Sequence, residues 1–102
     1  MSEESAIERE ILNYLNKQPH CRFYKTPNQG GKGARRKAQF KGMSDIAGCY
    51  HSLYIAIEVK TKTGKQSEDQ KVFEKDIKNA QGEYWLVRSL EELIYKLNRV
   101  IL

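Results

Sequence analysis

One apolar segment that ends in two charged residues constrains the fold of this 102-residue chain more than any other feature. Residues 54–60 are Tyr-Ile-Ala-Ile-Glu-Val-Lys, which is apolar enough for a central strand of a sheet. Because side chains alternate along a strand, the branched apolar side chains share one face, and Glu58 and Lys60 share the other. The simpler alternative is a half-exposed strand whose polar face carries an ion pair. This segment alone leaves both interpretations open.

Capping signals and the spacing of apolar residues predict the elements around this strand. Ser67-x-x-Gln70 and Ser89-x-x-Glu92 match the capping box, in which two polar side chains close the first turn of a helix. The expected elements are a helix at 3–17, strands at 21–26, 45–50 and 53–61, a helix after Ser67 that stops at Gly82, a strand at 83–88, and a helix after Ser89. The chain is then a single α/β domain over residues 1–102, in the order αβββαβα.

The helix expected between the third and fourth strands decides the strand directions. A helical crossover joins parallel strands, whereas the tight connection at residues 51–52 joins antiparallel ones. The central sheet is therefore expected to be mixed and flanked by helices. The packing stripe expected for the crossover helix consists of Val72, Phe73, Ile77 and Ala80.

Positive charge is concentrated in one part of the chain. The sequence has 18 Lys and Arg against 13 Asp and Glu, a net charge of +5 and a pI near 9.2. Residues 25–41 hold six of the positive charges and no acid, so the remaining residues carry 12 positive and 13 negative charges. A basic segment on a nearly neutral body indicates a polyanionic partner such as nucleic acid. For a basic run by itself, a solvated charged loop is the alternative.

The sequence disfavours several other classes of protein. No apolar run approaches the ~20 residues that span a bilayer, and the acidic N-terminus lacks a hydrophobic signal core, so we expect a cytoplasmic protein with no membrane partner. The glycines around Lys32 lack the Gly-Lys-Ser/Thr ending of a phosphate-binding loop, so no nucleotide cofactor is expected. A zinc-binding adaptor remains an alternative, although its four ligands lack finger spacing: His20, Cys21, Cys49 and His51.

Asp45 adds chemistry to the strand that carries Glu58. It begins the preceding strand, and a short hairpin folds it back beside the end of the next one, so that Asp45 and Glu58 face each other. Two opposed carboxylates repel unless a cation lies between them. Hard oxygen ligands of this kind suit Mg²⁺, which retains waters and also binds a substrate phosphate. Lys60 beside the metal is then expected to orient or deprotonate a water molecule.

Four fragments occur in an order that resembles a known group of nucleases. They are Lys41-Gly-Met-Ser-Asp45-Ile-Ala-Gly48, Ala56-Ile-Glu-Val-Lys60-Thr, Ser67-Glu-Asp-Gln70 and Trp85-Leu-Val-Arg88-Ser. Together they span nearly the whole chain and resemble the PD-(D/E)XK nuclease superfamily, more narrowly the stand-alone VRR-NUC domains of phages and bacteria. Ser44 departs from this pattern, because the superfamily name has proline there; the position supports the turn rather than the chemistry.

The resemblance implies a restriction-endonuclease-like fold and metal-dependent hydrolysis of phosphodiester bonds. It implies ligation of Mg²⁺, with Mn²⁺ as a substitute, by Asp45, Glu58 and the backbone carbonyl of Val59. It also implies kinship with Holliday junction resolvases, which act as homodimers on branched DNA, in the cytoplasm of a bacterial or phage-infected cell. A nuclease for flap or linear DNA, and a non-catalytic nucleic-acid-binding module, are the alternatives.

The resemblance also assigns residues outside the strand pair. The family has a glutamate on the first helix, which Glu8 matches best, ligating the metal directly or through water; Glu4, one turn earlier, is the fallback. Gln70 is expected either near the site or at its own helix start, and Arg88 either at the site or on a carboxylate. The residues expected to contact DNA are Lys32, Arg35, Arg36, Lys37, Lys41, Lys62 and Lys65.

Overall fold

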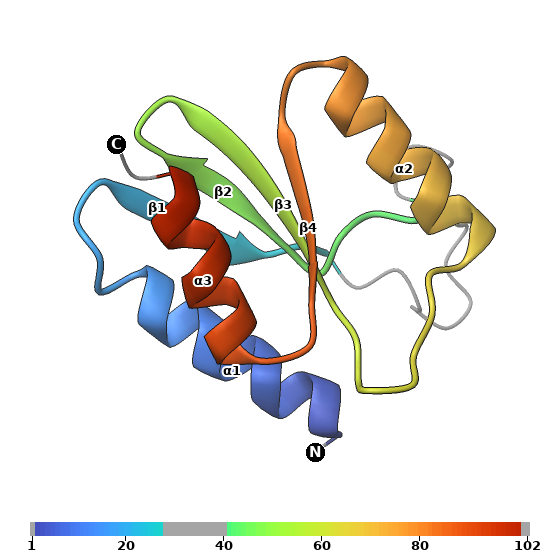
Figure 1. The fold of residues 1–102 in the computed structure, drawn as a ribbon, viewed down its shortest axis with the longest axis horizontal. Coiled ribbons are helices and arrows are strands. Elements are labelled where there is room, and N and C mark those ends of the chain that lie inside the picture. The colour runs from blue at the N-terminus through green and yellow to red at the C-terminus, as the bar shows by residue number, and fades with distance from the viewer. Residues whose placement is uncertain (1, 28–40, 101–102) are drawn as a thin grey trace.

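The computed structural model describes residues 2–27 and 41–100 and contains four strands and three helices (Figure 1). The elements are α1 (Glu3–Leu15), β1 (Cys21–Lys25), β2 (Ile46–Tyr50), β3 (Leu53–Val59), α2 (Glu68–Asn79), β4 (Glu83–Val87) and α3 (Leu90–Val100). The predicted order αβββαβα is confirmed, and each strand is one or two residues shorter than predicted.

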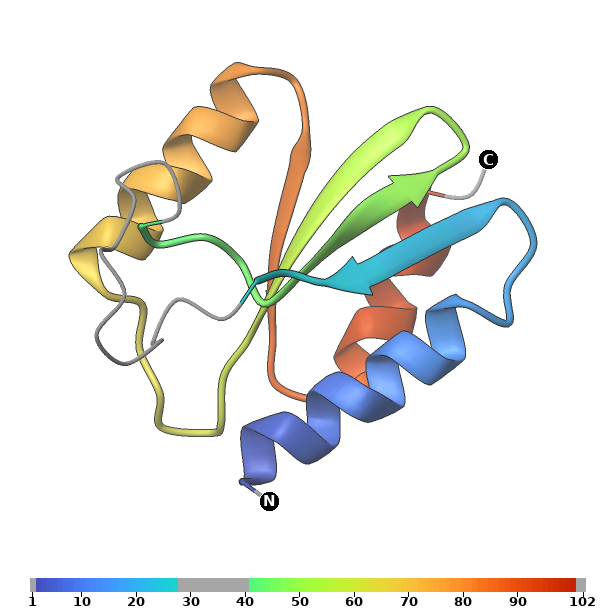
Figure 2. The same ribbon diagram turned by 180° about the vertical axis from the view of Figure 1, so that it is seen from behind.

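The four strands form one sheet in the order β1-β2-β3-β4. β1 with β2 and β2 with β3 are antiparallel, whereas β3 and β4, which α2 connects, are parallel. The mixed sheet is therefore confirmed, and β3 occupies a central position as its apolar sequence predicts. Seen from either side, the strands converge toward the loops that carry residues 41–45 and 60–67 (Figures 1 and 2).

One face of the sheet is packed against α1 and α3. Ile55, Ile57 and Val59 of β3 are fully buried there, beside Trp85 and Val87 of β4. The helices contribute apolar side chains at helical spacing to the same cluster: Ile11, Leu15, Leu93 and Leu97. This cluster is the hydrophobic core of the described residues.

The other face of the sheet lies against α2, which packs less tightly. Phe73 of α2 contacts Tyr84 edge to face, with ring centroids 6.2 Å apart, and Ile77 lies close to Gly82 and Tyr54. The stripe predicted for this helix is wrong at Val72, which is 59% exposed, and at Ala80, which is also exposed. α2 thus buries only part of its own surface, and none of its residues is fully buried.

α1 ends two residues before the predicted boundary because Asn16 takes another role. Its side-chain amide donates to the Phe23 carbonyl at 3.1 Å, and its side-chain oxygen accepts from the Phe23 N–H at 3.0 Å. Asn16 thus satisfies backbone groups on the outer edge of β1, where no further strand pairs. Within residues 2–27 and 41–100, no helix is both long and apolar enough to cross a membrane.

Candidate metal centre and active site

The register of the sheet brings Asp45 beside Glu58. Ile46 of β2 pairs with Ile57 of β3, so the residue before Ile46 lies opposite Glu58. Oδ2 of Asp45 accepts a hydrogen bond from the Val59 N–H at 2.8 Å, which fixes the carboxylate at the end of β3. The pairing predicted for these two residues is therefore present, although Asp45 lies just outside β2.

Two hydroxyl groups support the bend before β2. Thr26 donates to the carbonyl oxygens of Ser44 and Asp45, and its backbone N–H also donates to the Asp45 carbonyl at 2.9 Å. Ser44 is fully buried and donates to the Ile46 carbonyl at 3.0 Å. These bonds close the turn before β2, so the serine at position 44 serves the turn, as expected.

Glu58 is a buried carboxylate with an incomplete set of partners. Its side chain is 2% exposed, which contradicts the alternative of a half-exposed polar face. Oε2 accepts from the Gln70 side chain at 2.9 Å and lies 3.5 Å from Nζ of Lys60, whereas Oε1 is buried and has no hydrogen-bond partner among the described residues. Such an oxygen is costly to bury unless a ligand satisfies it.

Burial and neighbouring negative charge raise the pKa of both Asp45 and Glu58. Burial, together with the negative charge of Asp45, raises the pKa of Glu58 to about 8, against an opposing effect of Lys60. Burial also raises the pKa of Asp45, which the Val59 N–H partly offsets. Without a cation, the pair therefore holds a proton on Glu58 at neutral pH, and a bound cation would displace it.

Gln70 performs both of the roles that its sequence position allowed. Its side-chain oxygen accepts from the Ser67 N–H at 2.8 Å, and its own N–H donates to the Ser67 hydroxyl at 3.2 Å, which completes the predicted capping box. Its side-chain nitrogen simultaneously donates to Glu58. The start of α2 is thereby fixed to the carboxylate at the end of β3.

Glu8, rather than Glu4, is the acid of α1 that lies near this pair. Glu8 is 8% exposed and forms an ion pair with Lys25 of β1 at 2.7 Å, and its charge raises the pKa of Asp45. Glu4, one turn earlier, is only half-buried. Glu8 therefore contacts Lys25, and Lys25 in turn lines the cleft beside Asp45.

Lys25 belongs to the site and is absent from the predicted set. Glu8 raises its pKa by accepting a hydrogen bond, and the charges of Asp45 and Glu58 add to the effect. The sequence contained a signal for this position, since the first two strands of a meander pair in antiparallel fashion and so place the end of β1 beside the start of β2.

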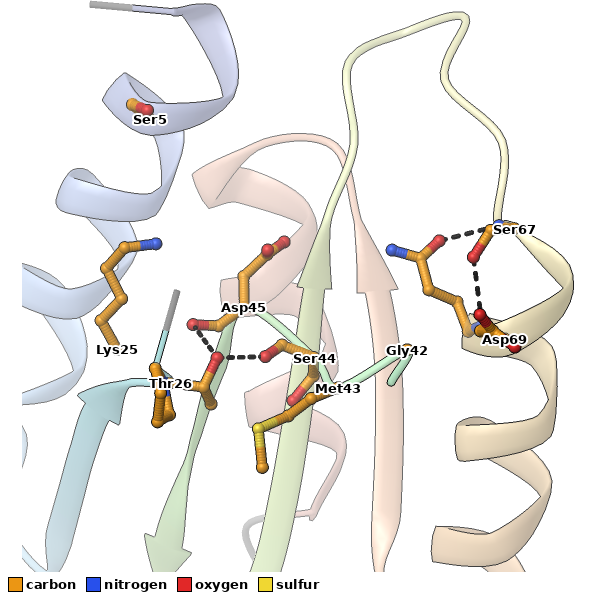
Figure 3. A pocket seen from close by; sticks show the side chains of 11 residues that line it. Ser5, Lys25, Thr26, Gly42, Met43, Ser44, Asp45, Ser67 and Asp69 are labelled. Atoms are coloured by element: carbon orange, nitrogen blue, oxygen red, sulfur yellow. Dashed lines mark hydrogen bonds between the residues drawn. The ribbon is translucent and has the colours of Figure 1, made fainter. Parts of the chain in front are cut away.

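A cleft of about 510 Å³ opens over Asp45 (Figure 3). Asp45 lies between Lys25 on one wall and Ser67, at the start of α2, on the other (Figure 3). Gly42 closes the floor: its φ is +70°, and a Cβ there would collide with the backbone of Asp69. The cleft is therefore lined by a cation, the carboxylates of Asp45 and Asp69, and the N-terminus of a helix, which together suit a cation and a phosphate group that accompanies it.

The predicted DNA contacts divide into two groups. Lys41, Lys62 and Lys65 are exposed, and the last two lie on the loop that follows β3. Lys32, Arg35, Arg36 and Lys37 lie outside the described residues.

The donor set fits Mg²⁺ better than zinc. Among residues 2–27 and 41–100, no three His, Cys, Asp or Glu side chains converge closely enough to hold a metal ion. His20 and His51 stack on each other with ring centroids 4.7 Å apart, and Cys49 is exposed, so these residues do not form a zinc cage. Asp45 and the unsatisfied Oε1 of Glu58 offer two carboxylates, which suffices for an ion that keeps most of its waters.

Comparison with known proteins assigns no family. No protein-family model matches the chain, and no curated protein matches it. Support for a function therefore comes from the side chains at the end of β3 and from their chemistry.

Proposed function

We propose that this chain is a metal-dependent DNA endonuclease, a single VRR-NUC-type domain of the PD-(D/E)XK superfamily with a restriction-endonuclease-like fold. The observation that carries the proposal is the buried Glu58 carboxylate, which has one unsatisfied oxygen and lies beside Asp45 and Lys60. Two neighbouring carboxyl groups with raised pKa values, one of which lines a cleft, are expected beside a cationic side chain in a catalytic site and are costly in a purely structural one.

Each residue of the set has a task suited to phosphodiester hydrolysis. Asp45 and Glu58, with the Val59 carbonyl, would hold Mg²⁺ or Mn²⁺, which when bound supplies positive charge to the phosphate and acidifies a water molecule. Lys60, 3.5 Å from Glu58 and largely buried, orients the attacking water and stabilises charge on the phosphate. Gln70 holds Glu58 in one orientation, and Lys25 lies where it can bind a phosphate oxygen.

The substrate proposed is branched DNA, with a four-way junction as the leading case. A chain of 102 residues has little room for a domain that reads bases, so shape is the more accessible feature. A homodimer would present two active sites to the two strands of a junction. Exposed Lys41, Lys62 and Lys65 would contact the phosphate backbone and contribute affinity rather than sequence choice.

Cleavage assays on four-way junction, flap, duplex and single-stranded DNA in Mg²⁺ or Mn²⁺ test the proposal. We expect Asp45→Asn and Lys60→Met to lower kcat by about 100-fold or more, because each removes a group that acts on the transition state. Asp76→Asn and Lys75→Met, exposed positions on α2, are the matched controls and should cleave like the wild type. Cleavage by wild type and Asp45→Asn at equal rates would contradict the proposal.

Calorimetry with Mg²⁺ in the absence of DNA separates the nuclease from a non-catalytic nucleic-acid-binding module. The nuclease predicts Mg²⁺ binding that Asp45→Asn and Glu58→Gln abolish and Asp76→Asn preserves. A binding module predicts DNA binding with no Mg²⁺ binding that depends on these residues. A monomer at micromolar concentration, measured by light scattering, would argue against junction resolution and for flap or linear DNA.

A further inference from the structure

Arg88 lies beside Lys60 because β3 and β4 run in the same direction. Val59 pairs with Val87, and the Lys60 N–H donates to the Val87 carbonyl at 3.0 Å, so both strands end at the same level. Lys60 and Arg88 are the first residues beyond these two ends. Parallel pairing therefore places a second cationic residue next to the lysine of the proposed active site.

The guanidinium of Arg88 is bound by the loop that follows Lys60. Its Nη1 donates to the carbonyl oxygens of Thr61, Lys62 at 3.3 Å and Gly64 at 3.0 Å. The sequence leaves two positions open for the Arg88 side chain, at the active site or on a carboxylate. The side chain instead binds backbone carbonyl oxygens. A planar, permanently charged donor is well suited to gathering several carbonyl oxygens of one turn.

That turn lies against the side chain of Lys60. The Gly64 N–H donates to the Thr61 carbonyl at 3.1 Å, which closes a tight turn over residues 61–64. A Cβ built on Gly64 would come within 3.3 Å of Cδ and 3.4 Å of Cβ of Lys60, so the bare glycine backbone covers the lysine stem. The Lys60 side chain is only 15% exposed as a result, and its ammonium faces Glu58.

The backbone of Arg88 is fixed from the opposite side by α3. The Arg88 N–H donates to the Glu92 carboxylate at 2.7 Å, and the Glu92 N–H donates to the Ser89 hydroxyl at 3.1 Å. The Arg88 backbone is thus hydrogen-bonded to the first turn of α3, and its side chain extends from there to the loop after β3. The contacts form a continuous series from α3 through Arg88 and Gly64 to Lys60.

From these contacts we propose that Arg88 is the positioning residue for Lys60, which it holds toward Glu58 through the turn at residues 61–64. The proposal rests on the proposed function for what Lys60 does, but the position of Lys60 can be measured without any reaction. Arg88 itself touches neither Asp45 nor Glu58 through any of its observed hydrogen bonds.

Amine acetylation followed by mass spectrometry, in EDTA and without DNA, tests the positioning directly. Arg88→Met keeps an apolar stem and removes the three hydrogen bonds of Nη1, so we expect acetylation of Lys60 to become about three times faster or more as the turn releases its stem. Arg99→Met is the matched control, because Arg99 lies on α3, where it contacts Tyr95, and it should leave Lys60 unchanged. Equal acetylation of Lys60 in wild type and Arg88→Met would overturn the proposal.

Cleavage kinetics distinguish the positioning of Lys60 from a role of Arg88 in stability alone, because the two predict different changes in kcat and KM. Arg88→Met should lower kcat about tenfold or more with KM unchanged, since a displaced catalytic group costs rate rather than binding. Arg88→Lys, which keeps the charge, should recover part of that loss. If the wild type cleaves no DNA, the nuclease function fails while the acetylation result still decides the positioning. If Arg88→Met does not fold, Arg88→Gln, which removes the guanidinium and its charge but stays polar, decides it in the same acetylation assay, with no change at Lys60 again overturning the proposal.

Discussion

The two faces of β3 are equally buried and yet serve opposite purposes. Toward α1 and α3, Ile55, Ile57 and Val59 belong to the hydrophobic core. The opposite face buries Glu58. One of its carboxylate oxygens has no hydrogen-bond partner within the described part of the chain, and burial raises the pKa of its carboxyl group to about 8. Burial of the apolar side chains stabilises the fold, whereas burial of the Glu58 carboxyl group destabilises it. Burial alone therefore does not show that a residue serves stability. The unsatisfied group on the second face is the one that points to a ligand.

Ile57→Ala should produce the largest change in stability, because it leaves a cavity on the apolar face. We expect the free energy of unfolding to fall by about 3–4 kcal/mol, measured by urea denaturation. The loss should be the same with and without Mg²⁺, since the side chain points away from the site. A loss that Mg²⁺ reverses would show that the two faces are not independent.

Glu58→Gln should change stability in the opposite direction and in a pH-dependent way. In the wild type without metal, the raised pKa means that the folded state binds more protons than the unfolded state between the ordinary value of 4.5 and about 8. The contribution of Glu58 to stability is therefore full below pH 4.5 and is lost as the pH rises through 8. Each pKa unit corresponds to about 1.4 kcal/mol.

Urea denaturation in EDTA from pH 5 to 8.5 measures this effect. The midpoint should fall with pH in the wild type and stay nearly level in Glu58→Gln, which is uncharged throughout. Glu74→Gln is the control, because Lys78 lowers the pKa of Glu74 and its titration lies below this range. A parallel pH dependence in wild type and Glu58→Gln would contradict the raised pKa of the buried Glu58 carboxyl group.

The sequence predicts the geometry of β3 well because strand periodicity is a local property. Alternation along β3 places Glu58 on the opposite face of the strand from Ile57. The short hairpin brings Asp45 beside Glu58, as the register of β2 and β3 confirms. The burial of Glu58 is not local, since it depends on residues distant in the sequence, such as Asp45 and Gln70, that lie against its side chain. The sequence alone therefore leaves a half-exposed strand as an equal alternative, and the burial of Glu58 in the structure contradicts that alternative.

Lys25 and Arg88 illustrate two different limits of the sequence. Lys25 could have been found, because an antiparallel meander places the end of β1 next to Asp45. Arg88 could be placed beside Lys60 by the parallel strands, but its partners are carbonyl oxygens of a turn. Backbone carbonyls occur at every residue and leave no compositional signal, so only the folded loop identifies them.

Gln70→Ala should have the smallest effect of the set and should separate the two roles of this residue. Loss of the capping bond costs about 1 kcal/mol of unfolding free energy, whether or not metal is present. Ser67→Ala, which removes the cap but leaves the bond to Glu58, is the matched control. We expect Gln70→Ala to weaken Mg²⁺ binding in calorimetry and Ser67→Ala to preserve it. Equal Mg²⁺ affinities would restrict Gln70 to its helix.

The backbone contacts at Thr26 and Gly42 have a consequence for how this chain can diversify. Thr26 is tied to Asp45 by its N–H and hydroxyl, and Gly42 lies so close to Asp69 that no side chain fits there. These contacts lie on both sides of residues 28–40 in the chain and are made by residues outside that segment. A substitution confined to residues 28–40 therefore removes no atom from either contact.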